Sequence, residues 1–311
     1  MGKTAFLFPG QGAQSVGMGA DLCEAFPAAA ETFDEANEIL GFDLRRICFS
    51  GPEDELTKTS VSQPAILVVS IAALRAMEAA AGDGAPACDA AAGLSLGEYT
   101  ALVAAEALRF EDAVRLVERR GTFMHEASAE NPGTMASIIG LDDDVVRSIC
   151  EEVGEKGIVA AVNFNCPGQV AISGEPDAVK AASDLAREKG AKMVVALKVE
   201  GAFHSALMQP ARDRLTAEIE KVEFQRARVP VVANVSGQYV TEPDEVRTSL
   251  VEQLTNPVFW SGAMGRLICD GFDLFYEIGP GKVLAGLMRR IDRSKKVTVL
   301  GTAKAIEELT S

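Results

Sequence analysis

Short β-rich apolar runs alternate with long helical patterns along this chain. Residues 4–8 (TAFLF) predict a strand, because the run is fully apolar after its first residue and ends at a Pro-Gly turn. Residues 62–82 are apolar on nearly every face and predict a long buried helix, with Pro64 near its first turn and Gly82 at its end. Such alternation favours an α/β fold with a parallel sheet.

The middle of the chain has a different order of elements. Between residues 133 and 200 the pattern predicts a strand, a helix, two strands, a helix and a last strand, which is the ferredoxin-like βαββαβ order. Strand-like runs of the first kind resume afterwards, at residues 229–237, 274–279 and 297–300. We therefore expect a large catalytic domain of residues 1–128 and 201–311, a small inserted domain of residues 129–200, and a cleft between them.

Composition narrows the class of protein. The chain has 311 residues, 48% hydrophobic and 24% charged, which is globular. No run approaches the roughly 18 apolar residues of a membrane span, and a strand pattern begins where a signal peptide would lie. The six cysteines are scattered without a C-x-x-C pair and only two histidines are present, so we expect a cytoplasmic protein with reduced thiols and no metal site.

The net charge of −15 argues against a surface that binds nucleic acid over a broad area. A local basic patch remains compatible with it. The candidate is residues 282–290 (KVLAGLMRR), with Lys282, Arg289 and Arg290.

Residues 93–97 read Gly-Leu-Ser-Leu-Gly and fit G-x-S-x-G, the pattern of a nucleophile elbow. In such an elbow the glycines permit a tight turn that presents the serine, here Ser95, at the start of a helix. Residues 88–93 (CDAAAG) must then form a strand, although alanine prefers a helix. The motif alone fits an ordinary strand-to-helix turn equally well.

A nucleophilic serine needs a base, and the histidines are His125 and His204. His125 lies late in a helical pattern, where a solvated side chain is the simpler interpretation. His204 lies where the inserted region returns to the main body, and it follows the serine as in hydrolase-like elbows. The acidic residues between Ser95 and His204 look like helix starts, so a backbone carbonyl is the expected partner of the imidazole.

A glycine-rich segment, residues 8–14 (FPGQGAQ), follows the first strand. The third glycine position of a dinucleotide fingerprint is occupied by Ser15, so that interpretation fails. Such a loop can instead present a backbone N–H to a developing oxyanion. The N–H groups of Gln11 and Leu96 would form a two-donor oxyanion hole.

Arg119 and Arg120 are adjacent in a predicted helix but differ in position. At about 100° per residue, Arg120 lies roughly 60° from Val117, at the edge of the apolar face, whereas Arg119 lies toward solvent. A guanidinium beside a buried face needs an anionic partner. That partner is either a protein carboxylate or an anionic group of a substrate near Ser95, and helix geometry alone does not separate the two.

Seven motifs occur in order over almost the whole chain: FPGQGAQ, GLSLGEY, RRGTFMHEA, NFNCPGQVAISG, GAFHSALM, NPVFW and EIGPGKVLAGLMRRI. Together they resemble the malonyl-CoA:acyl-carrier-protein transacylases of bacterial fatty-acid synthesis. The resemblance implies an α/β-hydrolase-like large domain and a ferredoxin-like small domain. It implies that Ser95 is the nucleophile, that His204 is the base and that Arg120 holds the malonyl carboxylate. Gln11 and Leu96 would supply the oxyanion N–H groups.

The resemblance also assigns secondary roles. The backbone carbonyl at Phe259, where the family commonly has Gln, would orient the histidine. Phe203 and the leucines beside the serine, Leu94 and Leu96, would shape the acyl pocket. The family usually has His where Leu94 stands, so a polar contact near the pocket is missing.

Three further residues are candidates for lining the cleft: Gln63, Asn163 and Asn165. For the two asparagines, a turn-forming role at strand ends is an equally good interpretation.

The resemblance implies a ping-pong acyltransferase that uses malonyl-CoA and the phosphopantetheine thiol of acyl carrier protein, without a metal or redox cofactor. We expect a cytoplasmic monomer that binds neither nucleic acid nor membrane. The alternatives are a freestanding transacylase of a polyketide pathway, a serine thioesterase or esterase, and a non-catalytic carrier-docking module.

Overall fold

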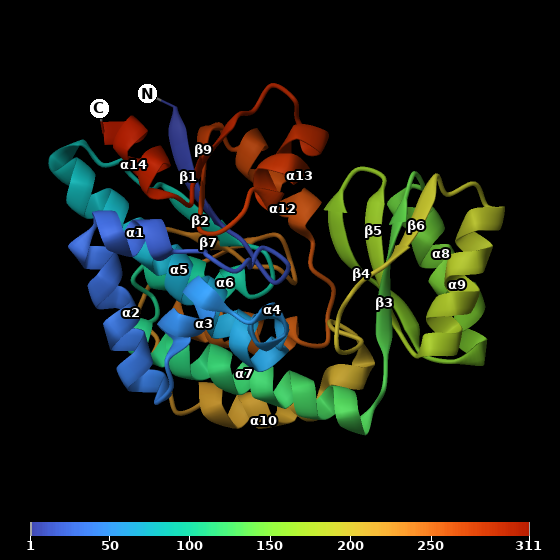
Figure 1. Ribbon diagram of the computed structural model, residues 1–311. Coiled ribbons are helices and arrows are strands. Elements are labelled where there is room, and N and C mark those ends of the chain that lie inside the picture. Colours follow the sequence, from blue (N-terminus) through green and yellow to red (C-terminus); the bar gives the residue numbers. More distant parts are fainter. Residues whose placement is uncertain (1, 311) are drawn as a thin grey trace.

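The computed structural model describes residues 2–310 and shows a mixed α/β fold with two separate sheets (Figure 1). In the larger sheet every neighbouring pair of strands is parallel except the last, which is antiparallel. Its strands, in spatial order, are β10 (Val297–Leu300), β9 (Phe272–Ile278), β1 (Lys3–Phe8), β2 (Ala90–Gly93), β7 (Val231–Val232) and β8 (Tyr239–Val240).

The two central strands, β1 and β2, end next to each other, and the expected site follows their carboxyl ends. In β1 the five residues after Lys3 are buried, and in β2 all residues are buried. The register pairs Phe8 with Gly93, so both strands end at the same level. The glycine-rich segment after β1 and the Ser95 turn after β2 therefore start side by side.

Helices cover the larger sheet and connect its strands. Those before β2 are α1 (Ala20–Ala25), α2 (Pro27–Leu40), α3 (Leu44–Ser50), α4 (Glu53–Thr57) and α5 (Thr59–Ala81). Those after it are α6 (Gly97–Ala104), α7 (Phe110–Glu130), α10 (Gln209–Ile219), α11 (Pro243–Gln253), α12 (Trp260–Cys269), α13 (Val283–Ile291) and α14 (Ala303–Thr310).

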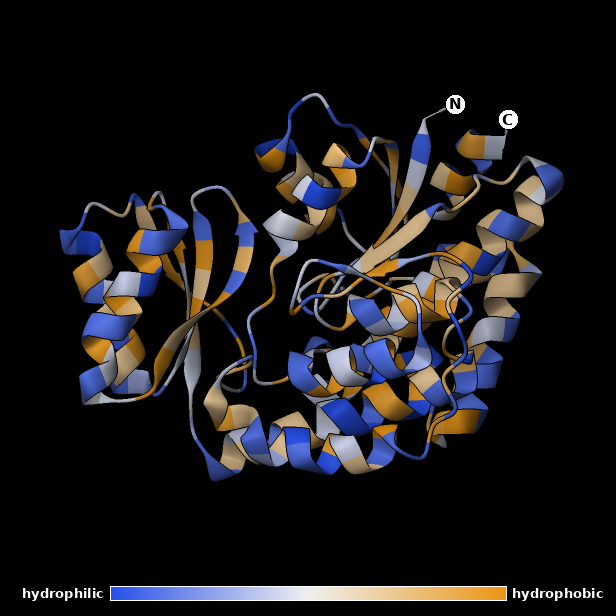
Figure 2. Ribbon diagram, turned by 180° about the vertical axis from the view of Figure 1, so that it is seen from behind, coloured by the Kyte–Doolittle hydropathy of each residue, from blue (hydrophilic) through white to orange (hydrophobic). Residues whose placement is uncertain are grey.

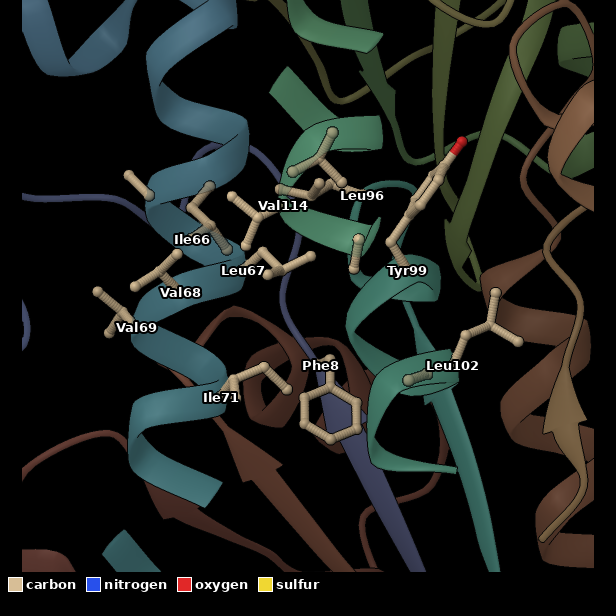
Figure 3. Packing of buried hydrophobic residues seen from close by; sticks show 14 of the residues in the cluster. Phe8, Ile66, Leu67, Val68, Val69, Ile71, Leu96, Tyr99, Leu102 and Val114 are labelled. Carbon is tan, nitrogen blue, oxygen red and sulfur yellow. The ribbon is translucent and has the colours of Figure 1, made fainter. Parts of the chain in front are cut away.

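The predicted buried helix is α5, and it begins three residues earlier than expected. Pro64 therefore lies inside the helix rather than near its first turn. Length and composition alone would let residues 59–84 cross a membrane, but 67% of the most apolar window is buried inside the fold, as in a core helix. In Figure 3, Ile71 points from α5 toward Phe8 of β1.

The second sheet is wholly antiparallel, and its strands lie in the order β4 (Val159–Cys166), β5 (Gln169–Gly174), β3 (Thr134–Ile139) and β6 (Met193–Ala196). The helices α8 (Asp143–Val153) and α9 (Pro176–Glu188) pack on its outer face, away from the larger sheet (Figure 1). Their apolar residues face the strands and their polar residues face outward (Figure 2). The predicted order of strands and helices in this region is confirmed.

Backbone hydrogen bonds join the second sheet to the main body, in addition to the covalent connections of the chain. Long helix α7 leads into β3 (Figure 1). The Val258 N–H donates to the carbonyl of Val162, and the Phe164 N–H donates to the carbonyl of Val258. This pairing attaches β4 to the segment before α12, so the second sheet is held against the main body.

Candidate active site

Ser95 occupies a strained turn between β2 and α6. Its φ is 52°, in the left-handed region that residues other than glycine rarely adopt. A Cβ on Gly93 would lie 1.9 Å from the carbonyl carbon of Gly97, and a Cβ on Gly97 would lie 2.2 Å from the Phe8 oxygen. Both positions therefore require glycine, and the predicted strand-turn-helix elbow is present.

His204 is the histidine beside the serine. The Ser95 Oγ and His204 Nε2 atoms are 2.8 Å apart, although 109 residues separate them in sequence. The His204 side chain is buried, and its φ of 61° shows a second left-handed turn. His125, by contrast, is exposed and lies 3.2 Å from the Glu200 carboxylate, as its helix position indicates.

A backbone carbonyl orients the imidazole, but it belongs to Gln253 rather than to Phe259. The Nδ1 atom of His204 lies 2.8 Å from the Gln253 oxygen. Gln253 ends α11, and the last carbonyls of a helix have no partner within it, so this oxygen is free to accept. The Phe259 ring instead stacks on Phe164 at 5.2 Å, and its N–H donates to the carbonyl of Asn234.

Burial keeps the imidazole neutral. It lowers the pKa of His204 to about 4, and the nearby Arg120 guanidinium acts in the same direction. The hydrogen bond to the Gln253 carbonyl opposes the shift. With Nδ1 donating to that carbonyl, Nε2 is left as an acceptor toward Ser95, which is the tautomer that a general base needs.

Arg120 is buried against the serine, as the helix-face argument predicts. Its side chain is 1% exposed, whereas the Arg119 side chain is 56% exposed. Arg120 Nη2 donates to Ser95 Oγ at 3.1 Å, and Nη1 donates to Gln63 Oε1 at 2.7 Å. Its Nε has no partner among the described residues. A cation with spare donors therefore adjoins the nucleophile.

A polar network that the sequence analysis missed supports these three residues. Gln253 is fully buried; its Oε1 accepts from Arg120 at 2.9 Å and its Nε2 donates to the carbonyl of Ser95 at 3.0 Å. Its Nε2 also donates to Glu98 Oε2 at 2.7 Å. The Asn234 side chain accepts from the Ser95 N–H at 2.6 Å. Only Glu98 lies within a recognised motif, so no sequence signal identified the other two residues.

The expected oxyanion donors come from two adjoining segments. A Cβ on Gly10 would lie 2.3 Å from the Leu94 oxygen, so the glycine-rich loop touches the elbow. Leu96 immediately precedes α6, where backbone N–H groups are unpaired within the helix. In the described part of the chain, the N–H groups of Gln11 and Leu96 donate no hydrogen bond. Both remain available to a ligand.

The other candidates differ in placement. Phe203 is buried next to His204, and Leu94 is half-buried beside the serine. Gln63 does not line a surface: it is fully buried and bonded to Arg120. Asn163 and Asn165 are half-buried residues of β4, within the strand rather than in a turn at its end.

Comparison with known proteins shows which family the chain belongs to. A family profile described as an acyl transferase domain matches residues 5–307. The chain belongs to this family. It is 45% identical to the malonyl CoA-acyl carrier protein transacylase of Bacillus subtilis over 99% of this chain and 96% of that protein. It is 46% identical to the Escherichia coli (strain K12) transacylase over 98% of both chains.

Solved acyltransferases have the same fold. A malonyl-transacylase in complex with its type II polyketide synthase acyl-carrier protein superposes with a TM-score of 0.95, at 42% identity and 99% coverage of both chains. The acyltransferase assignment made from seven short motifs is thus confirmed over the full length.

Proposed function

We propose that this protein transfers a malonyl group from malonyl-CoA to the phosphopantetheine thiol of acyl carrier protein in fatty-acid synthesis, through a malonyl-serine intermediate. The observation that carries the proposal is the buried Arg120 guanidinium 3.1 Å from the oxygen of Ser95, which itself faces His204 at 2.8 Å. The names of the curated relatives and the carrier-protein complex of a structural relative support the same substrates.

In the first half-reaction, Ser95 Oγ attacks the thioester carbonyl while His204 Nε2 takes its proton. The oxyanion of the tetrahedral intermediate lies against the N–H groups of Gln11 and Leu96. Collapse breaks the carbon–sulfur bond, and His204 returns the proton to the departing coenzyme A thiolate.

In the second half-reaction the phosphopantetheine thiol gives its proton to His204. The thiolate attacks the malonyl-serine ester, and the same oxyanion donors stabilise the second tetrahedral intermediate. Ser95 leaves and regains the proton from His204. Both half-reactions proceed by acyl and proton transfer alone, so no metal or redox cofactor is needed.

Arg120 makes the site specific for an acyl group that carries its own carboxylate. A guanidinium pairs with a carboxylate through two parallel hydrogen bonds, and burial strengthens such a pair. Phe203, beside the base, and Leu94 and Leu96, on either side of Ser95, would limit the space at the acyl carbon next to the carbonyl.

Two finer features of the fold are consistent with the proposed function. A parallel sheet with a Ser elbow after a central strand is hydrolase-like, and an antiparallel β4-β5-β3-β6 sheet with two helices on one face is ferredoxin-like. We place the catalytic domain at residues 1–128 and 201–311 and the inserted domain at residues 129–200. We expect the protein to act as a cytoplasmic monomer.

The rival functions make different use of the same dyad. A thioesterase or esterase passes the acyl group to water and has no need of a buried cation at the serine. A carrier-docking module has no need of the contact between Ser95 and His204. A polyketide transacylase would use the same chemistry, but the curated relatives that cover the whole chain are named for the general carrier-protein reaction.

Intact-mass analysis after mixing with malonyl-, methylmalonyl- or acetyl-CoA tests the proposal. We expect one malonyl group on the wild-type protein, removal of that group by phosphopantetheinylated carrier protein, and no adduct on Ser95→Ala. Release of coenzyme A at full rate without an acceptor thiol would show a hydrolase instead.

A further inference from the structure

Glu98 is a buried carboxylate that the proposed mechanism does not use. It lies in the first turn of α6, three residues after Ser95, and its side chain is 1% exposed. Burial raises the pKa of Glu98, and hydrogen bonds from Gln253, Ser249 and Asn234 oppose that shift. Buried charges are costly unless they are bonded, so its place beside the nucleophile requires an explanation.

Every hydrogen-bond partner of the Glu98 carboxylate among the described residues is a donor. Oε2 accepts from Gln253 Nε2 at 2.7 Å and from the Asn234 N–H at 3.1 Å, and Oε1 accepts from Ser249 Oγ at 2.8 Å. An ionised carboxylate accepts at both oxygens and matches this arrangement. The nearby Arg120 charge also favours the ionised form.

Gln253 connects Glu98 to the whole site. Its backbone oxygen orients His204 at 2.8 Å and its Oε1 accepts from Arg120 at 2.9 Å. Its Nε2 must therefore face Glu98, because an amide presents its acceptor and its donors on opposite sides. Without an acceptor at Glu98, the amide would lose the stronger of its two donor contacts and could turn its NH₂ group toward the guanidinium.

Glu98 also balances a buried charge. Burial lowers the pKa of Arg120, and the negative charge of Glu98 opposes that shift. The two charges do not touch directly but are bridged by the Gln253 amide. When a malonyl carboxylate arrives, it brings a second negative charge to the same dry region, where Glu98 would repel it.

We propose that Glu98 is a positioning residue: acting through Gln253, it holds His204 and Arg120 in place, and it serves as the counter-charge of Arg120 in the empty site. This rests on the proposed function only for the identity of the malonyl group. The positioning role applies to any acylation of Ser95.

Two substitutions separate the hydrogen bond from the charge. Glu98→Gln can still accept from Gln253 and Asn234 through its amide oxygen, while its NH₂ group donates to Ser249 Oγ; the charge alone is lost. Glu98→Ala loses both. Glu277→Gln is a control for the loss of a buried negative charge outside the site, since Glu277 is also fully buried. Its two oxygens accept from the N–H groups of Leu284 and Ala285 at the start of α13, so the NH₂ group of the variant would face one of these donors and the variant should be less stable.

The measurements are the rate of Ser95 acetylation by p-nitrophenyl acetate, followed by intact mass, and kcat and KM for malonyl-CoA and acetyl-CoA. For Glu98→Ala we expect acetylation to slow about 100-fold, as when a general base is misplaced. For Glu98→Gln we expect acetylation within about threefold of wild type and a KM for malonyl-CoA about three- to tenfold lower, with an unchanged KM for acetyl-CoA. Glu277→Gln should change neither the acetylation rate nor the ratio of the two KM values.

Equal acetylation rates in Glu98→Ala and Glu98→Gln, or equal shifts of the two KM values in Glu98→Gln, would overturn the proposal. If Glu98→Ala does not fold, Glu98→Gln decides alone: a large loss of acetylation, or a KM for malonyl-CoA that fails to fall relative to acetyl-CoA, refutes the role. If wild type reacts with p-nitrophenyl acetate but not with malonyl-CoA, the proposed function fails while the acetylation rates still test positioning.

Discussion

At the scale of single residues, the burial of His204 sets the pH range of acylation. Its pKa is lowered to about 4, below the ordinary value of 6.5, so the neutral base persists to lower pH than an exposed histidine would allow. Acylation of Ser95 by p-nitrophenyl acetate should therefore stay flat from about pH 8 to about pH 5.5 and decline only as the pH approaches the lowered pKa. A midpoint near pH 6.5, with the fold intact by circular dichroism, would contradict this.

The same shift affects stability. Between the folded and unfolded pKa values of His204, the unfolded chain binds more protons, so the free energy of unfolding rises with pH through that window. The stabilisation that comes from keeping His204 neutral is fully present above about pH 6.5, the pKa in the unfolded chain, and it is lost as the pH falls toward about 4.

Arg120 determines the acyl preference in the proposed reaction. Arg120→Ala should lower the ratio of kcat/KM for malonyl-CoA to that for acetyl-CoA by roughly 100-fold or more, because the malonyl carboxylate would be left unpaired in a dry site. Arg120→Lys should be intermediate, since it restores the charge but not the fork. Arg119→Ala is the control, because its side chain is 56% exposed. Collapse of the ratio in that control, with Arg120→Ala unaffected, would reverse the assignment.

Individual residues also show what a sequence can reveal about this site. Arg120 was placed correctly because helical periodicity fixes which side of α7 it occupies. The carbonyl facing His204 was misassigned to Phe259, because a backbone acceptor carries no side-chain signature. Gln253 joins Ser95 and Glu98 across more than 150 residues, so only tertiary structure brings the three together.

At the scale of elements, β2 shows tertiary context overriding local propensity. Its three alanines favour a helix, yet all are buried between β1 and β7 in a parallel sheet. Small side chains fit there because α6 packs closely over the strand. The elbow was predictable from its glycines, whereas the start of α5 was not, because the residue at its N-cap, Lys58, makes no side-chain capping hydrogen bond.

The glycines of the elbow give a prediction about this element. Gly93→Ala should lower the free energy of unfolding by at least about 2 kcal/mol and abolish acylation, because the new Cβ would overlap the backbone of Gly97, 1.9 Å away. Gly265→Ala, in α12, has open space around the new Cβ and should raise stability by about 0.5–1 kcal/mol. Denaturant unfolding measures both. A similar free energy of unfolding for the two variants would show that the elbow accommodates the new Cβ without a large cost.

At the scale of the whole molecule, the alternation of strands and helices predicted the fold class and the inserted βαββαβ segment. It did not predict how the second sheet attaches. The hydrogen bonds between β4 and Val258 join segments about 95 residues apart. β4 makes them close to the places where its register with β5 shifts. Such a contact depends on packing between units, which periodicity within each unit does not encode.

The whole-molecule charge bears on carrier docking. Acyl carrier proteins are acidic, and a net charge of −15 would repel them, so the proposed partner needs a local basic surface. Lys282, Arg289 and Arg290 are all exposed at α13. The Arg290 guanidinium donates to the side chain of Gln169 in β5, so this basic surface lies where the larger sheet's helices meet the second sheet.

Reversing Arg289 and Arg290 to Glu together should therefore raise the KM for carrier protein about tenfold or more and flatten its dependence on salt, because the attraction that remains is shorter in range. Acylation by malonyl-CoA should change by less than about twofold, since neither residue contacts Ser95, His204 or Arg120. Arg115→Glu with Arg119→Glu supplies the matched control: it makes the same change in net charge on the exposed side of α7. Steady-state kinetics with varied carrier protein and varied salt measures both pairs. An equal rise in KM for the two pairs would mean that total charge repels the carrier and that α13 is not its docking site.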